Sequence, residues 1–267
     1  MKNIWRKIAV ITAAAVLLTA LCGCGRKSVN DTMSAKNMQT LVIGSDIYEP
    51  YNYIDTDGNR TGIDVEFAEA VCKKMGLRPV FVQINWDDKD EMLKSGKIDC
   101  LWGSFSMNGR EKLYRWAGPY MHSYQVVAVR DGANIRYISD LDGKRVSVQN
   151  GSKPEEYFLN DSSAPNVKNV YCFSKPDEAF AALKKGYVDA CALHELPMRQ
   201  MIERSDGEYR ILKNPLMRSN LGVAFSENSD SEIVEKMNKA MSEVIGNGTL
   251  EKILKKYDVD TSYIIKR

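Results

Sequence analysis

The sequence has few of the residues on which metal and thiol chemistry depend. Its 267 residues include two histidines and six cysteines, and none of these cysteines has CxxC spacing. This scarcity argues against a His-rich metal site or a CxxC redox motif. No serine or cysteine nucleophile motif and no glycine-rich phosphate loop is present either. We therefore expect no cofactor, no bound metal and no catalytic nucleophile.

The chain also lacks an excess of charge of either sign. It has 37 Lys and Arg against 35 Asp and Glu, with 44% apolar and 27% charged residues. Removing residues 1–23 takes away Lys2, Arg6 and Lys7, which leaves 34 basic against 35 acidic residues. A near-neutral chain of this composition is globular and has no electrostatic footprint for nucleic acid. We expect no nucleic-acid partner.

The N-terminal residues predict export and lipid anchoring. Three positive charges precede Ile8–Leu21, which is apolar except for two threonines. As a helix this stretch spans only about 21 Å, too short for the roughly 30 Å core of a bilayer. Together these features indicate a signal peptide over residues 1–23. The following Leu21-Cys22-Gly23-Cys24 resembles a bacterial lipobox with Cys24 as the lipidated residue, and polar residues 24–39 indicate a flexible tether. Plain secretion is the alternative.

The mature chain shows the same α/β pattern twice. Apolar runs bounded by turn residues predict strands at 41–44, 80–84 and 98–102 in the first half, and at 145–149, 167–173 and 188–193 in the second. Helices are expected at 64–75, capped by Asp64 and closed by Gly76, and at 89–95 and 177–185. Gly96 and Gly186, 90 positions apart, each end a helix and are followed by an aliphatic residue, Asp and a buried strand. We expect two similar lobes, each with a mostly parallel central sheet flanked by helices.

Two further strands are expected to connect the lobes. They lie at 124–129 and 221–225, after the first and second halves. Ser229 and Glu232 then form a predicted capping box for a helix that packs back on the first half. The chain would cross between the lobes twice, giving lobe one as 40–127 and 225–267 and lobe two as 128–224. Ligands of α/β sheets bind at strand carboxyl ends, so the cleft should lie between the lobes.

Four cysteines remain in this part of the chain: Cys72, Cys100, Cys172 and Cys191. Each lies in an apolar or helical run, so we expect buried free thiols. A disulfide stays open, because the predicted compartment permits one.

The order of several short motifs resembles a known family. From about Leu41 to Tyr257 the chain is similar to the bacterial extracellular solute-binding proteins of family 3, the polar amino-acid receptors of ABC importers, which include the glutamine-binding protein. The motifs are Tyr48-x-Pro50-Tyr51-x-Tyr53, Thr61-Gly62-Ile63-Asp64-Val65, Gly96-Lys97-Ile98-Asp99, Gly103 to Arg110, Trp116-x-Gly118-Pro119-Tyr120, Asp140-Leu141-x-Gly143-Lys144, Asn150-Gly151-Ser152 and Val188-Asp189-Ala190. The resemblance implies a periplasmic-binding-protein-like type II fold with two hinge crossovers.

The resemblance also implies a set of ligand-binding residues. The positions of Tyr48 and Trp86 flank the ligand side chain in the family, and the position of Arg110 grips the ligand α-carboxylate. An arginine binds a carboxylate with two parallel hydrogen bonds, which lysine cannot match. Backbone N–H groups and hydroxyls are expected from the loop Gly103, Ser104, Phe105 and Ser106 and from Gly151 and Ser152.

One position departs from the family pattern. Where the family usually has an Asp for the ligand ammonium, this chain has His194, followed by Glu195. A neutral imidazole accepts a hydrogen bond but supplies no charge. Either Glu195 enters the cleft through a one-residue shift, or Asp46 supplies the charge from lobe one, or the ligand is not a standard α-amino acid.

The resulting prediction is a monomeric, extracytoplasmic receptor, anchored to the membrane through Cys24, that delivers a small amino-acid-like ligand to an ABC permease. It is not expected to be an enzyme. The alternatives are a cyclohexadienyl (arogenate or prephenate) dehydratase on the same fold, with Glu195 or His194 as the acid, and an extracellular ligand sensor.

Overall fold

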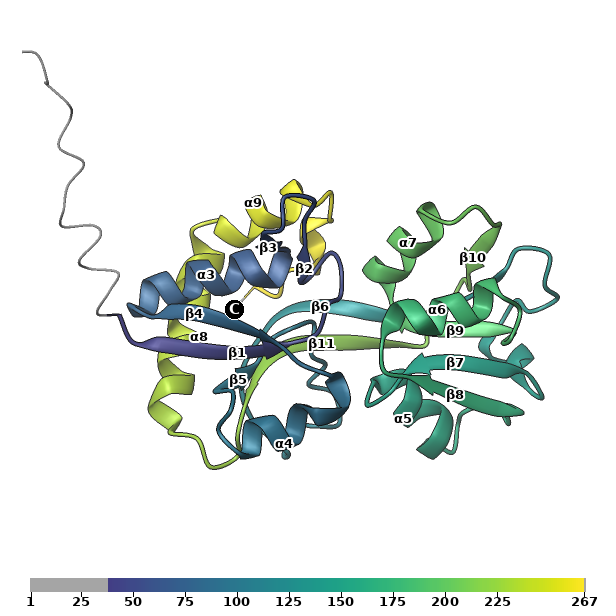
Figure 1. The fold of residues 1–267 in the computed structure, drawn as a ribbon, viewed down its shortest axis with the longest axis horizontal. Helices are drawn as coiled ribbons and strands as arrows, with labels where there is room; N and C mark the ends of the chain where they lie inside the picture. The colour runs from purple at the N-terminus through teal and green to yellow at the C-terminus, as the bar shows by residue number, and fades with distance from the viewer. Residues whose placement is uncertain (1–37, 267) are drawn as a thin grey trace, which may run out of the picture. The chain divides into compact units, whose positions relative to one another are not determined.

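The computed structural model describes residues 38–266. The predicted signal peptide, Cys24 and nearly all of the predicted tether lie outside the described residues. The described part has two lobes (Figure 1). Its strands are β1 Thr40–Ser45, β2 Tyr53–Ile54, β3 Arg60–Thr61, β4 Arg78–Gln83, β5 Cys100–Leu101, β6 Arg115–Arg130, β7 Arg145–Gln149, β8 Asn169–Phe173, β9 Ala190–His194, β10 Tyr209–Ile211 and β11 Met217–Phe225. Its α-helices are α3 Ile63–Met75, α4 Lys89–Lys94, α5 Lys153–Asn160, α6 Pro176–Lys184, α7 Glu195–Glu203, α8 Ser231–Gly246 and α9 Thr249–Lys256, with 3-10 turns at Trp86–Asp88, Ile138–Leu141 and Thr261–Tyr263.

Lobe one is built around β1. This strand pairs in parallel with β4 on one side and β5 on the other, and β11 lies antiparallel beside β5. Helices α3, α8 and α9 share one buried core with these strands, with Phe67 of α3 and Met237 of α8 fully buried in it. The C-terminal helices therefore pack back on the first half of the chain, as predicted (Figure 1).

Lobe two repeats this plan around β7. The strand pairs in parallel with β8 and β9, and β6 lies antiparallel beside β9. Successive residues of β6 face opposite sides of the sheet, so Val126 and Ala128 join one core with α6 and α7, while Val127 and Val129 join another with α5. The predicted α/β fold with two lobes is confirmed.

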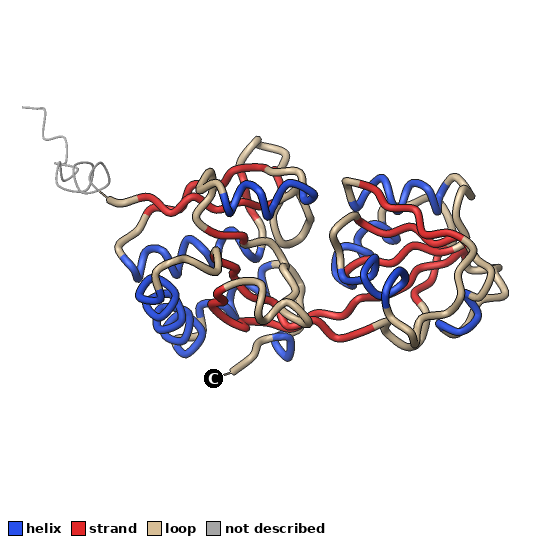
Figure 2. The backbone as a smooth tube through the Cα atoms, turned by 90° about the horizontal axis from the view of Figure 1, so that it is seen from below, coloured by secondary structure: helices blue, strands red, loops and turns tan. Residues whose placement is uncertain are grey.

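The two connecting strands pair with each other. β6 and β11 run antiparallel from Met217 opposite Gln125 to Phe225 opposite Arg115. Figures 1 and 2 show both strands passing from one lobe to the other. Because each also pairs within a lobe, nine strands form one continuous hydrogen-bonded sheet rather than two separate sheets. The predicted lobe boundaries at 127/128 and 224/225 fall inside these strands, where backbone pairing continues unbroken.

Two predicted helix caps are wrong. Gly62, not Asp64, is the N-cap of α3, and its φ of 130° together with a close approach to the Tyr51 carbonyl leaves no room for a side chain. Asp230, not Ser229, caps α8, where its carboxylate accepts the Glu232 N–H at 2.9 Å. Sequence spacing alone does not show which of several neighbouring residues caps a helix.

Asp64 instead lies fully buried in lobe one and holds a loop of the cleft. Its Oδ2 accepts the Ser104 N–H at 2.6 Å, and its Oδ1 accepts the Tyr120 O–H at 2.7 Å. Burial raises the pKa of Asp64 to about 7, while these two hydrogen bonds act to lower it. Ser104 has a positive φ of 46°, which is unfavourable for a residue other than glycine. The hydrogen bond that the Ser104 N–H donates to Asp64 stabilises that conformation.

Polar contacts also join the lobes outside their connecting strands. Arg204, at the end of α7, donates two hydrogen bonds to Glu49 after β1, at 2.6 and 2.7 Å. Ser174 Oγ after β8 donates to Asp87 at 3.1 Å. The structure therefore has the lobes close together.

The four cysteines of the described part are free thiols. Cys72, Cys100 and Cys191 are buried, as expected, but Cys172 is exposed. Cys172 lies in β8, the strand at one end of the strand order of the sheet.

We expect the Asp64→Ala variant to be less stable by about 3 kcal/mol, because it leaves two buried donors without an acceptor. Chemical denaturation measures this loss. Tyr120→Phe removes one of the two donors and should cost less, and Asp206→Ala, at an exposed position, should change the free energy of unfolding by under about 0.5 kcal/mol. A loss at Asp64 no larger than at Asp206 would contradict the anchoring role.

Candidate functional site

A cavity lies between the lobes at the carboxyl ends of their strands. Its volume is about 30 Å³, room for roughly two water molecules. All the predicted ligand-binding residues except Gly151 and Glu195 line it. The lining residues are Asp46, Tyr48, Trp86, Gly103, Ser104, Phe105, Ser106, Arg110, Gln125, Gln149, Ser152, Lys153, Pro154, Leu193 and His194.

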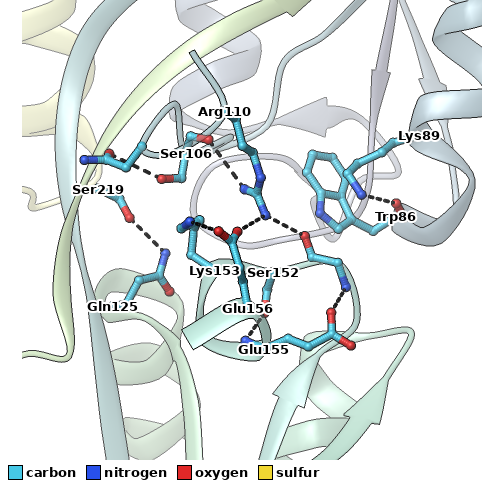
Figure 3. A network of polar contacts seen from close by, with 12 residues as sticks. Trp86, Lys89, Ser106, Arg110, Gln125, Ser152, Lys153, Glu155, Glu156 and Ser219 are labelled. Atoms are coloured by element: carbon cyan, nitrogen blue, oxygen red, sulfur yellow. Dashed lines mark hydrogen bonds and ion pairs between the residues drawn. The ribbon is translucent and has the colours of Figure 1, made fainter. Parts of the chain in front are cut away.

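Arg110 is a buried, positively charged residue on the lobe-one side of the cavity. Its side chain is 11% exposed and lies over the Phe105 ring, with its guanidinium carbon 5.2 Å from the ring centroid. Burial lowers the pKa of Arg110, yet an arginine remains charged at any physiological pH. Its Nη2 donates to the Gly151 carbonyl at 3.1 Å and lies 3.6 Å from a carboxylate oxygen of Glu156, so both partners come from lobe two (Figure 3).

The loop after β5 supplies polar groups next to this arginine. Gly103 is required there, because a side chain would collide with Ser45 Oγ of β1. The left-handed Ser104 and the following Ser106 are both buried and line the cavity. The loop Gly103 to Ser106 therefore lies at the cavity, as expected from the sequence.

Two large aromatic side chains close the cavity. Trp86 lies edge-on to Phe105, with ring centroids 5.0 Å apart. The Tyr48 hydroxyl accepts the backbone N–H of His194 at 3.0 Å, which links lobe one to lobe two. Tyr51 belongs to the lobe-one core instead.

Asp46 is the buried carboxylate of the cavity. It follows β1, is 8% exposed, and accepts a hydrogen bond from Gln149 Nε2 of lobe two at 2.7 Å. Burial raises the pKa of Asp46 to about 6, with the Gln149 hydrogen bond and the charge of Lys89 acting the other way. Asp46 can therefore bear the negative charge that His194 cannot supply.

The start of α5 differs from the expectation that Gly151 and Ser152 offer free N–H donors. The Gly151 N–H donates to Glu155 Oε2 at 2.6 Å, and Ser152 Oγ caps the helix by accepting the Glu155 N–H at 3.3 Å. Gly151 presents its carbonyl to Arg110 instead. Glu156 is held near Arg110 by Lys153, at 2.7 Å (Figure 3).

His194 and Glu195 point in different directions because β9 ends and α7 begins between them. His194 lines the cavity, and burial lowers its pKa to about 3, so the ring is neutral at physiological pH. Glu195 does not line the cavity. Its carboxylate accepts hydrogen bonds from Arg199, the shorter at 2.7 Å, and from the Tyr263 hydroxyl at 2.9 Å.

Sequence reasoning missed five lining residues. Gln149, Lys153 and Pro154 adjoin the predicted Gly151-Ser152, and Leu193 adjoins His194, so a wider window around each strand end would have included them. Gln125 had no such signal. It lies inside the long strand β6, where alternation with apolar neighbours indicates only a strand.

Within residues 38–266, no group of three or more His, Cys, Asp or Glu side chains is arranged to hold a metal ion. No helix in the same part of the chain is long and apolar enough to cross a membrane.

Comparisons with known proteins agree with this architecture. The model of the bacterial extracellular solute-binding proteins, family 3, matches residues 41–260. The probable histidine-binding protein of Campylobacter jejuni is 27% identical over 94% of this chain and 98% of its own length. The arginine-binding extracellular protein ArtP of Bacillus subtilis is also 27% identical, over 94% of this chain and 98% of its own length.

A solved structure shows the same fold. An ancestral arginine-binding protein bound to arginine has a TM-score of 0.76 and 30% identity, covering 82% of this chain and 97% of that one. The predicted type II fold is confirmed by this likeness. The match of the family model over most of the chain shows that it belongs to the bacterial extracellular solute-binding proteins of family 3.

Proposed function

We propose that this protein is a receptor that traps a small polar amino acid between its two lobes and delivers it to an ABC importer. The observation that carries the proposal is the pairing of opposite charges in one buried cavity. Arg110 suits a carboxylate, and Asp46 suits an ammonium group. The names of the relatives, which bind arginine or histidine, support an amino acid as the ligand.

Binding requires motion about the connecting strands. A cavity of about 30 Å³ is too small for an amino acid, so the lobes must part and Arg110 must leave its lobe-two partners. Two paired crossovers restrict such motion to bending at one hinge. Ligand then stabilises closure through contacts with both lobes that neither lobe offers alone.

The proposal places the receptor outside the cytoplasm. The predicted signal peptide and lipidation at Cys24 would tether a monomer to the membrane face, near a permease that recognises the closed lobes. Release to the permease favours moderate affinity, with a dissociation constant in the micromolar range, or about −8 kcal/mol.

Two features of the structure weigh against a dehydratase. Glu195 is engaged by Arg199 and Tyr263 away from the cavity, and His194 has a pKa lowered to about 3 by burial. Glu195 therefore does not reach a substrate in the cavity, and His194 is neutral there, so neither is placed to act as the acid. An extracellular sensor would use the same binding step and would differ only in the partner protein that recognises the closed lobes.

A thermal-shift screen of the purified protein tests the class of ligand. We expect one polar amino acid at a hundredfold excess over its dissociation constant to raise the melting temperature by roughly 5–10 °C. Arogenate and prephenate serve as the comparison. Turnover of either compound, with no stabilisation by any amino acid, would show that the protein is a dehydratase and not a receptor.

Arg110→Lys tests the carboxylate site. The variant keeps the positive charge but loses the two parallel hydrogen bonds of the guanidinium, so ligand affinity should fall at least tenfold, or by at least about 1.4 kcal/mol. Isothermal titration calorimetry measures the change, and the melting temperature without ligand monitors the fold. Arg136→Lys, at an exposed position, is the matched control. Equal affinities in the two variants would rule out Arg110 as the carboxylate partner.

The pH dependence of binding tests Asp46. Because burial raises its pKa to about 6, the carboxyl is mostly protonated at pH 5 and ionised at pH 7. An ammonium ligand binds the ionised form, so affinity should rise about tenfold from pH 5 to pH 7. His194 stays neutral throughout, since its pKa is about 3.

The measurement needs a ligand that does not itself titrate in this range, such as L-arginine or L-glutamine. Asp46→Asn still accepts the Gln149 hydrogen bond but has no titrating group, so its affinity should be lower and flat with pH. An unchanged tenfold rise in this variant would assign the dependence to another group, such as Asp64 with its pKa of about 7.

A further inference from the structure

A buried hydrogen-bond acceptor beside the cavity has no partner. Gln125 of β6 lines the cavity and is 1% exposed. Its amide nitrogen lies 2.9 Å from His194 Nε2. The same nitrogen donates to Ser219 Oγ at 3.2 Å (Figure 3). Its amide oxygen, Oε1, is buried without a hydrogen-bond partner among residues 38–266. A buried acceptor of this kind is destabilising unless something pairs with it.

The contacts of Gln125 with His194 and Ser219 favour this orientation of the amide. Ser123 Oγ lies 3.2 Å from His194 Nδ1 and can accept a hydrogen bond from it. In the tautomer that has the proton on Nδ1, Nε2 is an acceptor. Nε2 then accepts one amide hydrogen of Gln125, and Ser219 accepts the other. In the reverse orientation the amide NH2, with two donors, would occupy the place of the single unpaired oxygen, and burying two unpaired donors costs more than burying one unpaired acceptor.

We propose that Gln125 Oε1 accepts a hydrogen bond from the ammonium group of the ligand. The inference rests on the proposed function and specifies how the site recognises an amino group without the usual carboxylate at position 194. Asp46 supplies the negative charge, and Gln125 supplies a directed acceptor held by His194 and Ser219.

A buried acceptor dedicated to one ligand group selects strongly against ligands that lack this group. An analogue without the amino group leaves Oε1 unpaired in a closed cavity and also leaves Asp46 without a cation. The site should therefore reject carboxylic acids that match the amino acid in every other respect. Gln125 is a specificity-determining residue in this account.

The test compares ligand pairs in native and variant protein by calorimetry. L-Arginine is paired with 5-guanidinopentanoate and L-histidine with 3-(imidazol-4-yl)propanoate, and any other amino acid found to bind is paired with its deamino acid in the same way. In Gln125→Met we expect about a tenfold loss of affinity for the amino acid and less than a twofold change for its deamino partner. Any general disturbance of His194 or Ser219 would affect both ligands equally and cancels in the ratio.

Two further variants sharpen the comparison. Gln125→Glu keeps an acceptor oxygen, so it should retain the preference for the amino acid. Gln200→Met makes the same change at another glutamine whose buried amide oxygen is unpaired but which does not line this cavity, so it should leave the preference unchanged.

The outcomes separate the two proposals. Equal losses for both members of a pair in Gln125→Met overturn the role of Gln125 while leaving an amino-acid receptor. Native protein that binds no amino acid at all overturns the proposed function, and the role of Gln125 with it.

Discussion

The antiparallel pairing of β6 with β11 is the constraint on which the rest of the structure depends. Each strand also pairs inside a lobe, so the two lobes share one sheet and cannot separate without bending these strands. The pairing brings the carboxyl ends of β1 and β5 opposite those of β7 and β9. As a result, side chains far apart in the sequence, such as Asp46 and Gln149, meet in one cavity.

Charge compensation explains how this cavity tolerates its buried ionisable groups. Arg110 has the Gly151 carbonyl and Glu156 as partners, and Asp46 has Gln149, so each charge from lobe one is matched by a group from lobe two. His194 has no charge that needs a partner, because burial lowers its pKa to about 3. Closing the lobes therefore leaves neither charge of this pair without a partner.

The sequence was sufficient for the fold and for most of the cavity. Apolar runs ending in glycine mark strand ends such as that before Gly103, and strand ends in α/β sheets are where sites form. Side-chain partners were not predictable, because they depend on contacts between distant residues. Asp64 has the spacing of a helix cap but binds Ser104 and Tyr120, and the Gly151 N–H is taken by Glu155. Whether the Gln125 oxygen has a hydrogen-bond partner depends on β9 and β11, which pair with β6 in the structure and are distant from it in the sequence.

The partners of Arg110 also bear on affinity. A ligand carboxylate does not meet a free guanidinium in closed lobes, since it must replace the Gly151 carbonyl and compete with Glu156. The measured affinity is then the difference between two sets of contacts with the same cation, and it is smaller than the gross strength of either. Glu156 in turn keeps Lys153 as a partner when Arg110 turns to the ligand. Because Arg110 exchanges partners within the protein for the ligand carboxylate, it can select carboxylates while the ligand can still dissociate.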